Sequence, residues 1–128
     1  MTRSILPVAA VAILCSACGA SPTNPGNTSA TYTPTQDPAT ATTLTYTSDV
    51  QPILSADCTV CHNASRKDGG YDFTSYTGVM RAVTAGSAAS PLVRQTQPGG
   101  PMYSNFRGSA SIKSEIIRRW VVDFKAVQ

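Results

Sequence analysis

The chain has 128 residues, which is enough for one small domain with extensions. Its formal net charge of +3 is mild, and only 13% of its residues are charged. A nucleic-acid-binding protein would need a basic patch with interleaved aromatic residues, and this composition gives no reason to expect one. The four cysteines form two pairs close in sequence, Cys15 with Cys18 and Cys58 with Cys61, and the single histidine is His62.

Residues 1–18 are typical of a bacterial secretion signal. Arg3 supplies a positive start, and an apolar stretch from Ile5 to Leu14 follows it. This stretch is shorter than the roughly 20 apolar residues that a membrane-spanning helix needs. Small residues precede Cys18, as in a lipoprotein signal, so we expect Cys18 to be lipidated after cleavage. The expected location is the periplasm or cell surface, with the protein lipid-anchored to the outer membrane.

Residues 19–44 predict a linker. They are rich in Thr, Ser, Pro and Gly, carry a single charge at Asp37 and show no apolar periodicity. A segment of this composition cannot bury a core, so we expect it to be disordered. It would tether a folded domain, residues 45–128, to the membrane.

The folded domain is expected to begin with a helix. Thr47 or Ser48 can cap this helix, and Val50, Ile53 and Leu54 are spaced for one buried face. The predicted helix then leads directly into a Cys-x-x-Cys-His motif.

That motif, Cys58-Thr-Val-Cys-His62, is the pattern of covalent attachment of a c-type haem. Positions i, i+3 and i+4 of a helical turn share one face, so Cys58, Cys61 and His62 can lie together. The two thiols can then form thioether bonds to the vinyl groups of one porphyrin. His62 can bind the iron as its proximal ligand.

Three other interpretations of the motif are weaker. A structural zinc site needs four ligands, and the chain offers no second pair near His62. A thioredoxin-like redox pair would lie in a βαβ pattern, which is not visible in the sequence. A disulfide between Cys58 and Cys61 would close a very small loop and leave the adjacent histidine unexplained.

Three more helices are predicted beyond the motif, separated by loops. A short helix capped at residues 74–75 is followed by another over residues 90–94, with Pro91 in its first turn. A Pro/Gly loop over residues 97–102 precedes the last helix, about residues 111–126, whose apolar stripe is the clearest in the chain. The stripe consists of Ile112, Ile116, Ile117, Trp120, Val121 and Phe124. The basic residues placed mostly off it are Lys113, Arg118, Arg119 and Lys125.

Methionine is the next choice for a second axial ligand to the iron, because His62 is the only histidine. Met80 lies on the apolar face of a predicted helix, where methionine commonly fills the core. Met102 lies in the Pro/Gly loop, where no packing pattern accounts for it. We therefore expect Met102 to be the distal ligand, with Met80 or an open iron site as the alternatives.

Taken in order, these pieces resemble a small bacterial class I cytochrome c domain. The matching segments are Asp49–Leu54, Cys58–His62, Ser90–Arg94, Gly99–Met102 and Ile116–Trp120. The resemblance implies a small all-α fold around one covalent haem c, with His62 proximal, Met102 distal and the first and last helices crossing. The family usually has proline directly after the ligand methionine, whereas here Tyr103 follows and Pro101 precedes.

The expected function is electron transfer rather than catalysis, with single electrons carried between periplasmic or surface redox partners. The alternatives are a five-coordinate haem that senses a gas or acts as a weak peroxidase, and a haem-free lipoprotein with a disulfide. Arg94 could pair with a haem propionate or could simply be solvated. Basic residues over 80–128 could steer acidic partners or form a solvated face. The candidates for haem packing are Phe73, Tyr76, Leu92, Ile116 and Trp120.

Overall fold

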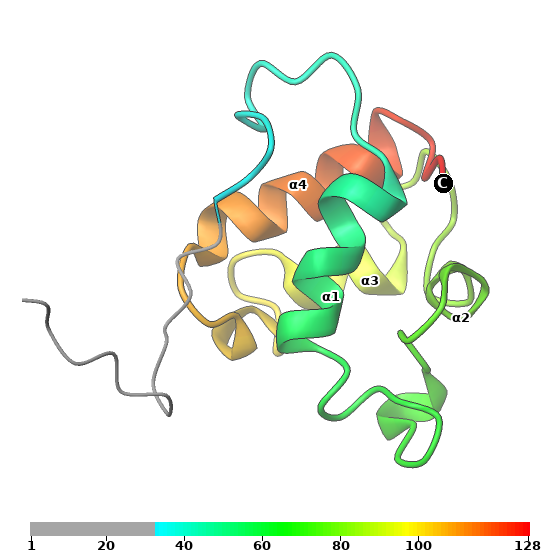
Figure 1. Ribbon diagram of the computed structural model, residues 1–128. Coiled ribbons are helices and arrows are strands. Elements are labelled where there is room, and N and C mark those ends of the chain that lie inside the picture. Colours follow the sequence, from blue (N-terminus) through cyan, green and yellow to red (C-terminus); the bar gives the residue numbers. More distant parts are fainter. Residues whose placement is uncertain (1–32) are drawn as a thin grey trace, which may run out of the picture.

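The computed structural model describes residues 33–128 (Figure 1). The predicted signal peptide over residues 1–18, its lipidation candidate Cys18 and the linker up to residue 32 lie outside this range. The described residues form helices, turns and loops with no strand, which agrees with the predicted all-α class. None of their helices is long and apolar enough to cross a membrane.

The first helical segment consists of a π-helical turn, η1 (Tyr46–Val50), followed by the α-helix α1 (Gln51–Asp57). Thr45 caps it, because its side chain accepts a hydrogen bond from the backbone N–H of Ser48 at 3.3 Å. The cap therefore lies two to three residues before the predicted ones. The predicted face is confirmed, since Val50, Ile53 and Leu54 are all buried.

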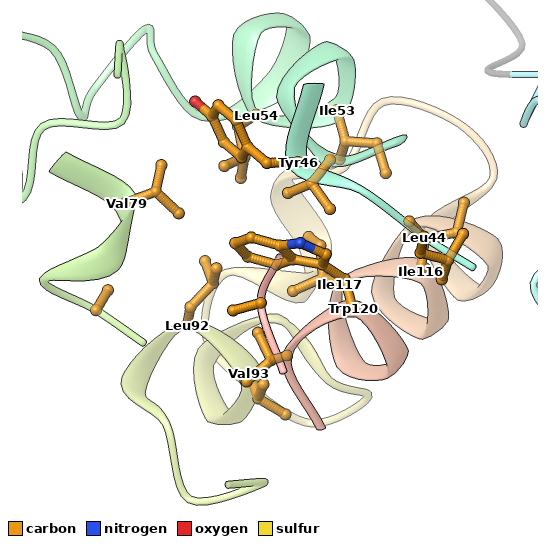
Figure 2. Packing of buried hydrophobic residues seen from close by; sticks show 14 of the residues in the cluster. Leu44, Tyr46, Ile53, Leu54, Val79, Leu92, Val93, Ile116, Ile117 and Trp120 are labelled. Atoms are coloured by element: carbon orange, nitrogen blue, oxygen red, sulfur yellow. The ribbon is translucent and has the colours of Figure 1, made fainter. Parts of the chain in front are cut away.

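The last helix, α4 (Ala110–Val122), crosses this segment and contacts it mainly at η1. Tyr46 and Trp120 pack with their ring centroids 5.9 Å apart at one end. Asp57 and Lys113 form an ion pair at the other. Figure 2 shows Trp120 at the centre of the core, where its side chain is 0% exposed. Figure 1 shows α1 passing in front of α4.

The end of α4 differs from the prediction of residue 126. The helix stops at Val122, and the left-handed φ angles of Lys125 and Ala126, 57° and 56°, then turn the chain back. The carbonyl of Val127 then accepts hydrogen bonds from Trp120 Nε1 at 2.7 Å and from the backbone N–H of Tyr46 at 3.0 Å. The C-terminus is thereby fastened to both main helical segments.

Two neighbouring residues of α4 reverse their predicted roles. Ile112 was placed on the apolar stripe but is 36% exposed, whereas Lys113 was placed off it but is buried. The physical reason is the carboxylate of Asp57, which pairs with Lys113 and draws it inward. Helical periodicity contains no information about such a partner.

Two short helices complete the helical framework. α2 (Tyr76–Met80) is capped by Ser75, whose hydroxyl accepts from the N–H of Gly78 at 3.1 Å, as predicted. α3 (Pro91–Thr96) begins at its proline, also as predicted, and packs against α4. Two 3₁₀ turns, η2 (Asp68–Gly70) and η3 (Tyr103–Asn105), lie in the loops.

The part of the predicted linker that the structure describes, residues 33–44, belongs to the folded domain. Leu44 and Ala41 are buried in the core. The Arg119 guanidinium donates to the carbonyls of Pro38 and Ala41, and Thr35 donates to the Asp49 carboxylate at 2.6 Å. The domain boundary therefore lies before residue 45. The prediction missed it because the segment that packs on α4 has the Thr/Pro-rich composition of a linker.

Candidate cofactor site

The Cys-x-x-Cys-His motif continues the hydrogen-bonded turns of α1. The N–H of Cys58 bonds to Leu54, and the carbonyl of Cys58 then accepts from Cys61 at 3.1 Å and from His62 at 2.9 Å. These bonds form one helical turn, as the i, i+3, i+4 spacing predicted. The two thiols and the imidazole are thus presented by one short, rigid piece of backbone.

Residues after the motif fold back over it and orient the histidine. The ring of Phe73 lies 4.8 Å from the ring of His62, and the N–H of Phe73 donates to the His62 carbonyl at 2.8 Å. The N–H of Asp68 donates to the Cys61 carbonyl at 3.1 Å. His62 Nδ1 is buried and has no hydrogen-bond partner among the described residues.

A pocket of about 730 Å³ opens beside the motif, within the size range of small-molecule and cofactor sites. Cys58, Cys61, His62 and Met102 all line it. Four residues that the sequence placed in one site therefore lie around one space. The other lining residues are Asp57, Val60, Asp68, Gly69, Tyr71, Phe73, Ala82, Pro91, Leu92, Gln95, Thr96, Asn105, Phe106 and Arg107.

The loop that carries Met102 is held by hydrogen bonds at several points. The N–H of Met102 donates to the Gln95 carbonyl at 2.9 Å, and the Gln97 side chain donates to the Ser114 carbonyl on α4 at 2.9 Å. The Asn105 amide donates to Met102 Sδ at 3.4 Å. Met102 is 36% exposed, so its thioether lies at the edge of the pocket and not in the core.

The two candidate methionines are in different surroundings. Met80 lies on α2, packs against the hydrophobic core and is not among the residues that line the pocket. Its surroundings are those of a core-filling methionine, as the sequence predicted.

Only some of the predicted packing residues line the pocket. Phe73 and Leu92 do, but Tyr76, Ile116 and Trp120 do not. Tyr76 packs against Tyr46 and donates its hydroxyl to the Ala126 carbonyl at 2.8 Å. Ile116 and Trp120 are fully buried in the core between the helices. The sequence could not separate these roles, because both need large apolar side chains.

Several pocket residues were not predicted. Arg94 is exposed and does not line the pocket, whereas Arg107 does. Asp57 lines the pocket directly before Cys58, and Asn105 lies three residues after Met102. Proximity to the motif and to the methionine could have indicated Asp57 and Asn105, while Arg107 had no signal in the sequence.

The surroundings of the Cys58 thiol differ from those of a thioredoxin-type redox pair. Both cysteines are free thiols. Burial, and after it the negative charge of Asp57, raises the pKa of Cys58 to about 12. Cysteine pairs of the thioredoxin type have lowered thiol pKa values, because exchange requires a thiolate. The surroundings of Cys58 therefore oppose thiol–disulfide exchange.

Part of the predicted basic surface is paired with acidic side chains. Arg118 pairs with Glu115 at 2.7 Å, Arg119 pairs with Asp123 at 2.9 Å, and Lys113 is buried against Asp57. These three residues do not form the free positive face that would steer an acidic partner.

Within residues 33–128, no group of three or more His, Cys, Asp or Glu side chains is placed to hold a metal ion. Comparisons of the chain with protein-family models, with curated proteins and with solved structures found no match.

Proposed function

We propose that the chain is a mono-haem c-type cytochrome that carries single electrons between redox partners outside the cytoplasm. The observation that carries the proposal is the shared pocket, which is lined by both cysteines of the Cys-x-x-Cys-His motif, by His62 and by Met102. Its volume, about 730 Å³, is appropriate for a cofactor.

The residues present fit a covalent haem. Cys58 and Cys61, as free thiols on one turn, would hold the porphyrin through thioether bonds. The imidazole of His62 has a buried nitrogen, Nδ1, without a hydrogen-bond partner among residues 33–128, which is consistent with a group that needs a ligand to complete its interactions. When bound, the haem would supply an iron that accepts and donates one electron, with His62 and Met102 as its axial ligands.

The rest of the pocket would keep water away and hold the ligands in place. Phe73, Leu92 and Phe106 are buried and form apolar parts of the wall. A low-polarity wall disfavours the more highly charged oxidised iron and so raises the reduction potential. The Asn105 amide orients the sulfur of Met102.

The setting follows from the predicted signal. Lipidation of Cys18 would anchor the protein to the membrane, and the residues between Cys18 and the domain would act as a tether. Val60 is an exposed apolar side chain at the pocket. A small exposed apolar edge suits the weak, brief contacts of electron-transfer proteins.

The test is a spectroscopic redox titration of mature protein made with c-type maturation machinery, with and without carbon monoxide. We expect one reversible one-electron couple and a reduced spectrum that carbon monoxide does not change. Ready binding of carbon monoxide would instead support gas sensing or weak peroxidase chemistry. Protein without haem would instead support the remaining interpretation, a haem-free lipoprotein with a disulfide.

A second prediction concerns the loop that presents Met102. A methyl group on Gly100 would lie 2.5 Å from the Arg94 carbonyl and would also overlap the Gln95 carbonyl, which accepts the N–H of Met102. Gly100→Ala should therefore displace the loop and lower the free energy of unfolding by about 1–3 kcal/mol. It should also weaken the absorption band that a bond between Met102 and the iron would produce, the Met-to-iron charge-transfer band.

Gly99→Ala is the control for Gly100→Ala. Gly99 has a φ of +87°, and a methyl group there meets no atom within 4 Å. The backbone strain should cost about 1–2 kcal/mol, but the band should remain. Equal loss of the band in both variants would show that Gly100 has no particular role.

A further inference from the structure

A buried ion pair lies beside the pocket, between the end of α1 and the start of α4. Asp57 Oδ2 is 2.6 Å from Lys113 Nζ, and the two side chains are 1% and 2% exposed. Lys113 Nζ also donates to the backbone carbonyl of Arg107 at 2.8 Å. Two charges at this depth are costly to desolvate, and apolar residues of similar size often stabilise a fold as well. The pair is therefore a candidate for a role beyond stability.

The pair is asymmetric with respect to the pocket. Asp57 lines the pocket and directly precedes Cys58, whereas Lys113 is not a lining residue. Arg107 lies 3.4 Å from Asp57 Oδ1, but its side chain is exposed, so solvent screens its charge. Asp57 raises the pKa of the neighbouring Cys58 thiol by more than Lys113 lowers it, so the carboxylate is the buried charge that acts more strongly at the motif, and Lys113 is its buried counter-charge.

We propose that Asp57 and Lys113 set the reduction potential of the haem through opposed electrostatic effects. This inference rests on the proposed haem in the pocket. Reduction adds one electron to the iron, so a buried carboxylate beside the motif favours the oxidised form and a buried ammonium favours the reduced form. Because both charges are shielded from water, each acts with little solvent screening.

The test is a set of midpoint potentials measured on purified, haem-loaded protein. Asp57→Asn removes the anion and should favour the reduced form, whereas Lys113→Met removes the cation and should favour the oxidised form. We expect each change to alter the equilibrium constant of reduction about tenfold, equivalent to about 59 mV for a one-electron couple. The shifts should have opposite signs, and the double variant should return close to the original potential.

Asp68→Asn is the matched control. Asp68 is an acid that lines the same pocket, but its side chain is 42% exposed. Solvent should screen its charge, so removing it should shift the potential much less than removing Asp57 does. The charge-transfer band and a thermal unfolding curve are recorded for each variant, because release of Met102 would change the potential for another reason.

Opposite shifts with the band retained, and a small shift in Asp68→Asn, would support the proposal. The proposal would be overturned if the two potentials shifted in the same direction or did not shift. It would also be overturned if they shifted only where the charge-transfer band is lost, or if Asp68→Asn shifted the potential as much as Asp57→Asn does. If Lys113→Met does not accumulate as folded protein, the test uses Asp57→Asn and the double variant. The proposal then requires a raised reduction potential in Asp57→Asn and a potential close to that of the wild type in the double variant. A wild-type chain with no haem couple would overturn the proposed function instead, which is a different result.

Discussion

Replacing Met102 with alanine should remove the Met-to-iron charge-transfer band and open the iron to carbon monoxide. Met102 is the only methionine in the described residues that lines the pocket. A Met/His ligand pair raises the reduction potential. Its loss should therefore lower the potential by on the order of 100 mV, a fraction of the roughly 0.8 V range that axial ligands span. Absorption spectra and a redox titration of the purified variant measure all three effects.

Met80→Ala is the matched control. Met80 packs against the core on α2, away from the residues that line the pocket. The variant should keep the band and the original potential and should lose only stability, by about 1–3 kcal/mol, since the side chain is partly buried. Loss of the band in Met80→Ala with its retention in Met102→Ala would reverse the assignment of the distal ligand.

Trp120→Ala should cause the largest loss of stability of any single core substitution proposed for this chain. Trp120 is 0% exposed, packs against Tyr46 and donates Nε1–H to the Val127 carbonyl at 2.7 Å. Truncation removes the ring, leaves a cavity between α4 and η1 and frees the C-terminal turn. We expect a loss of about 3–5 kcal/mol in the free energy of unfolding, measured by denaturant titration with circular dichroism.

Trp120→Phe tests whether this loss comes from packing or from the pocket. Phenylalanine keeps most of the apolar volume, so it should cost clearly less than alanine. Because Trp120 does not line the pocket, the haem spectrum of the folded Trp120→Phe variant should be unchanged. A changed charge-transfer band in a stable Trp120→Phe protein would show that Trp120 also influences the pocket, which would contradict a role in core packing only.

Local signals in the sequence predicted the local structure well. Ser75 and Pro91 begin α2 and α3 as expected, because a capping side chain and a fixed φ angle act within a few residues. The turn from Cys58 to His62 also follows from spacing alone. Met102 lies far along the chain from this turn, and it could be assigned to the same pocket only because no packing pattern accounts for it in its loop.

Long-range contacts account for the errors. Lys113 is buried because it meets Asp57, 56 residues away along the chain. The segment before residue 45 packs on the domain because Arg119 donates a hydrogen bond to it and its apolar side chains are buried in the core, although its composition is that of a linker. Trp120 packs in the core and Phe73 lines the pocket, and nothing in their local sequence distinguishes these two roles. Each of these outcomes depends on a partner that periodicity and composition do not name.

The most direct test of the account is the mass of the peptide that carries residues 58–62, isolated by proteolysis from mature protein made with c-type maturation machinery. The account predicts that one haem remains bound to this peptide after denaturation, through both cysteines. It also predicts that replacing both Cys58 and Cys61 with serine abolishes the attachment. A peptide of unmodified mass, with free thiols or with a disulfide between Cys58 and Cys61, would contradict the proposed function.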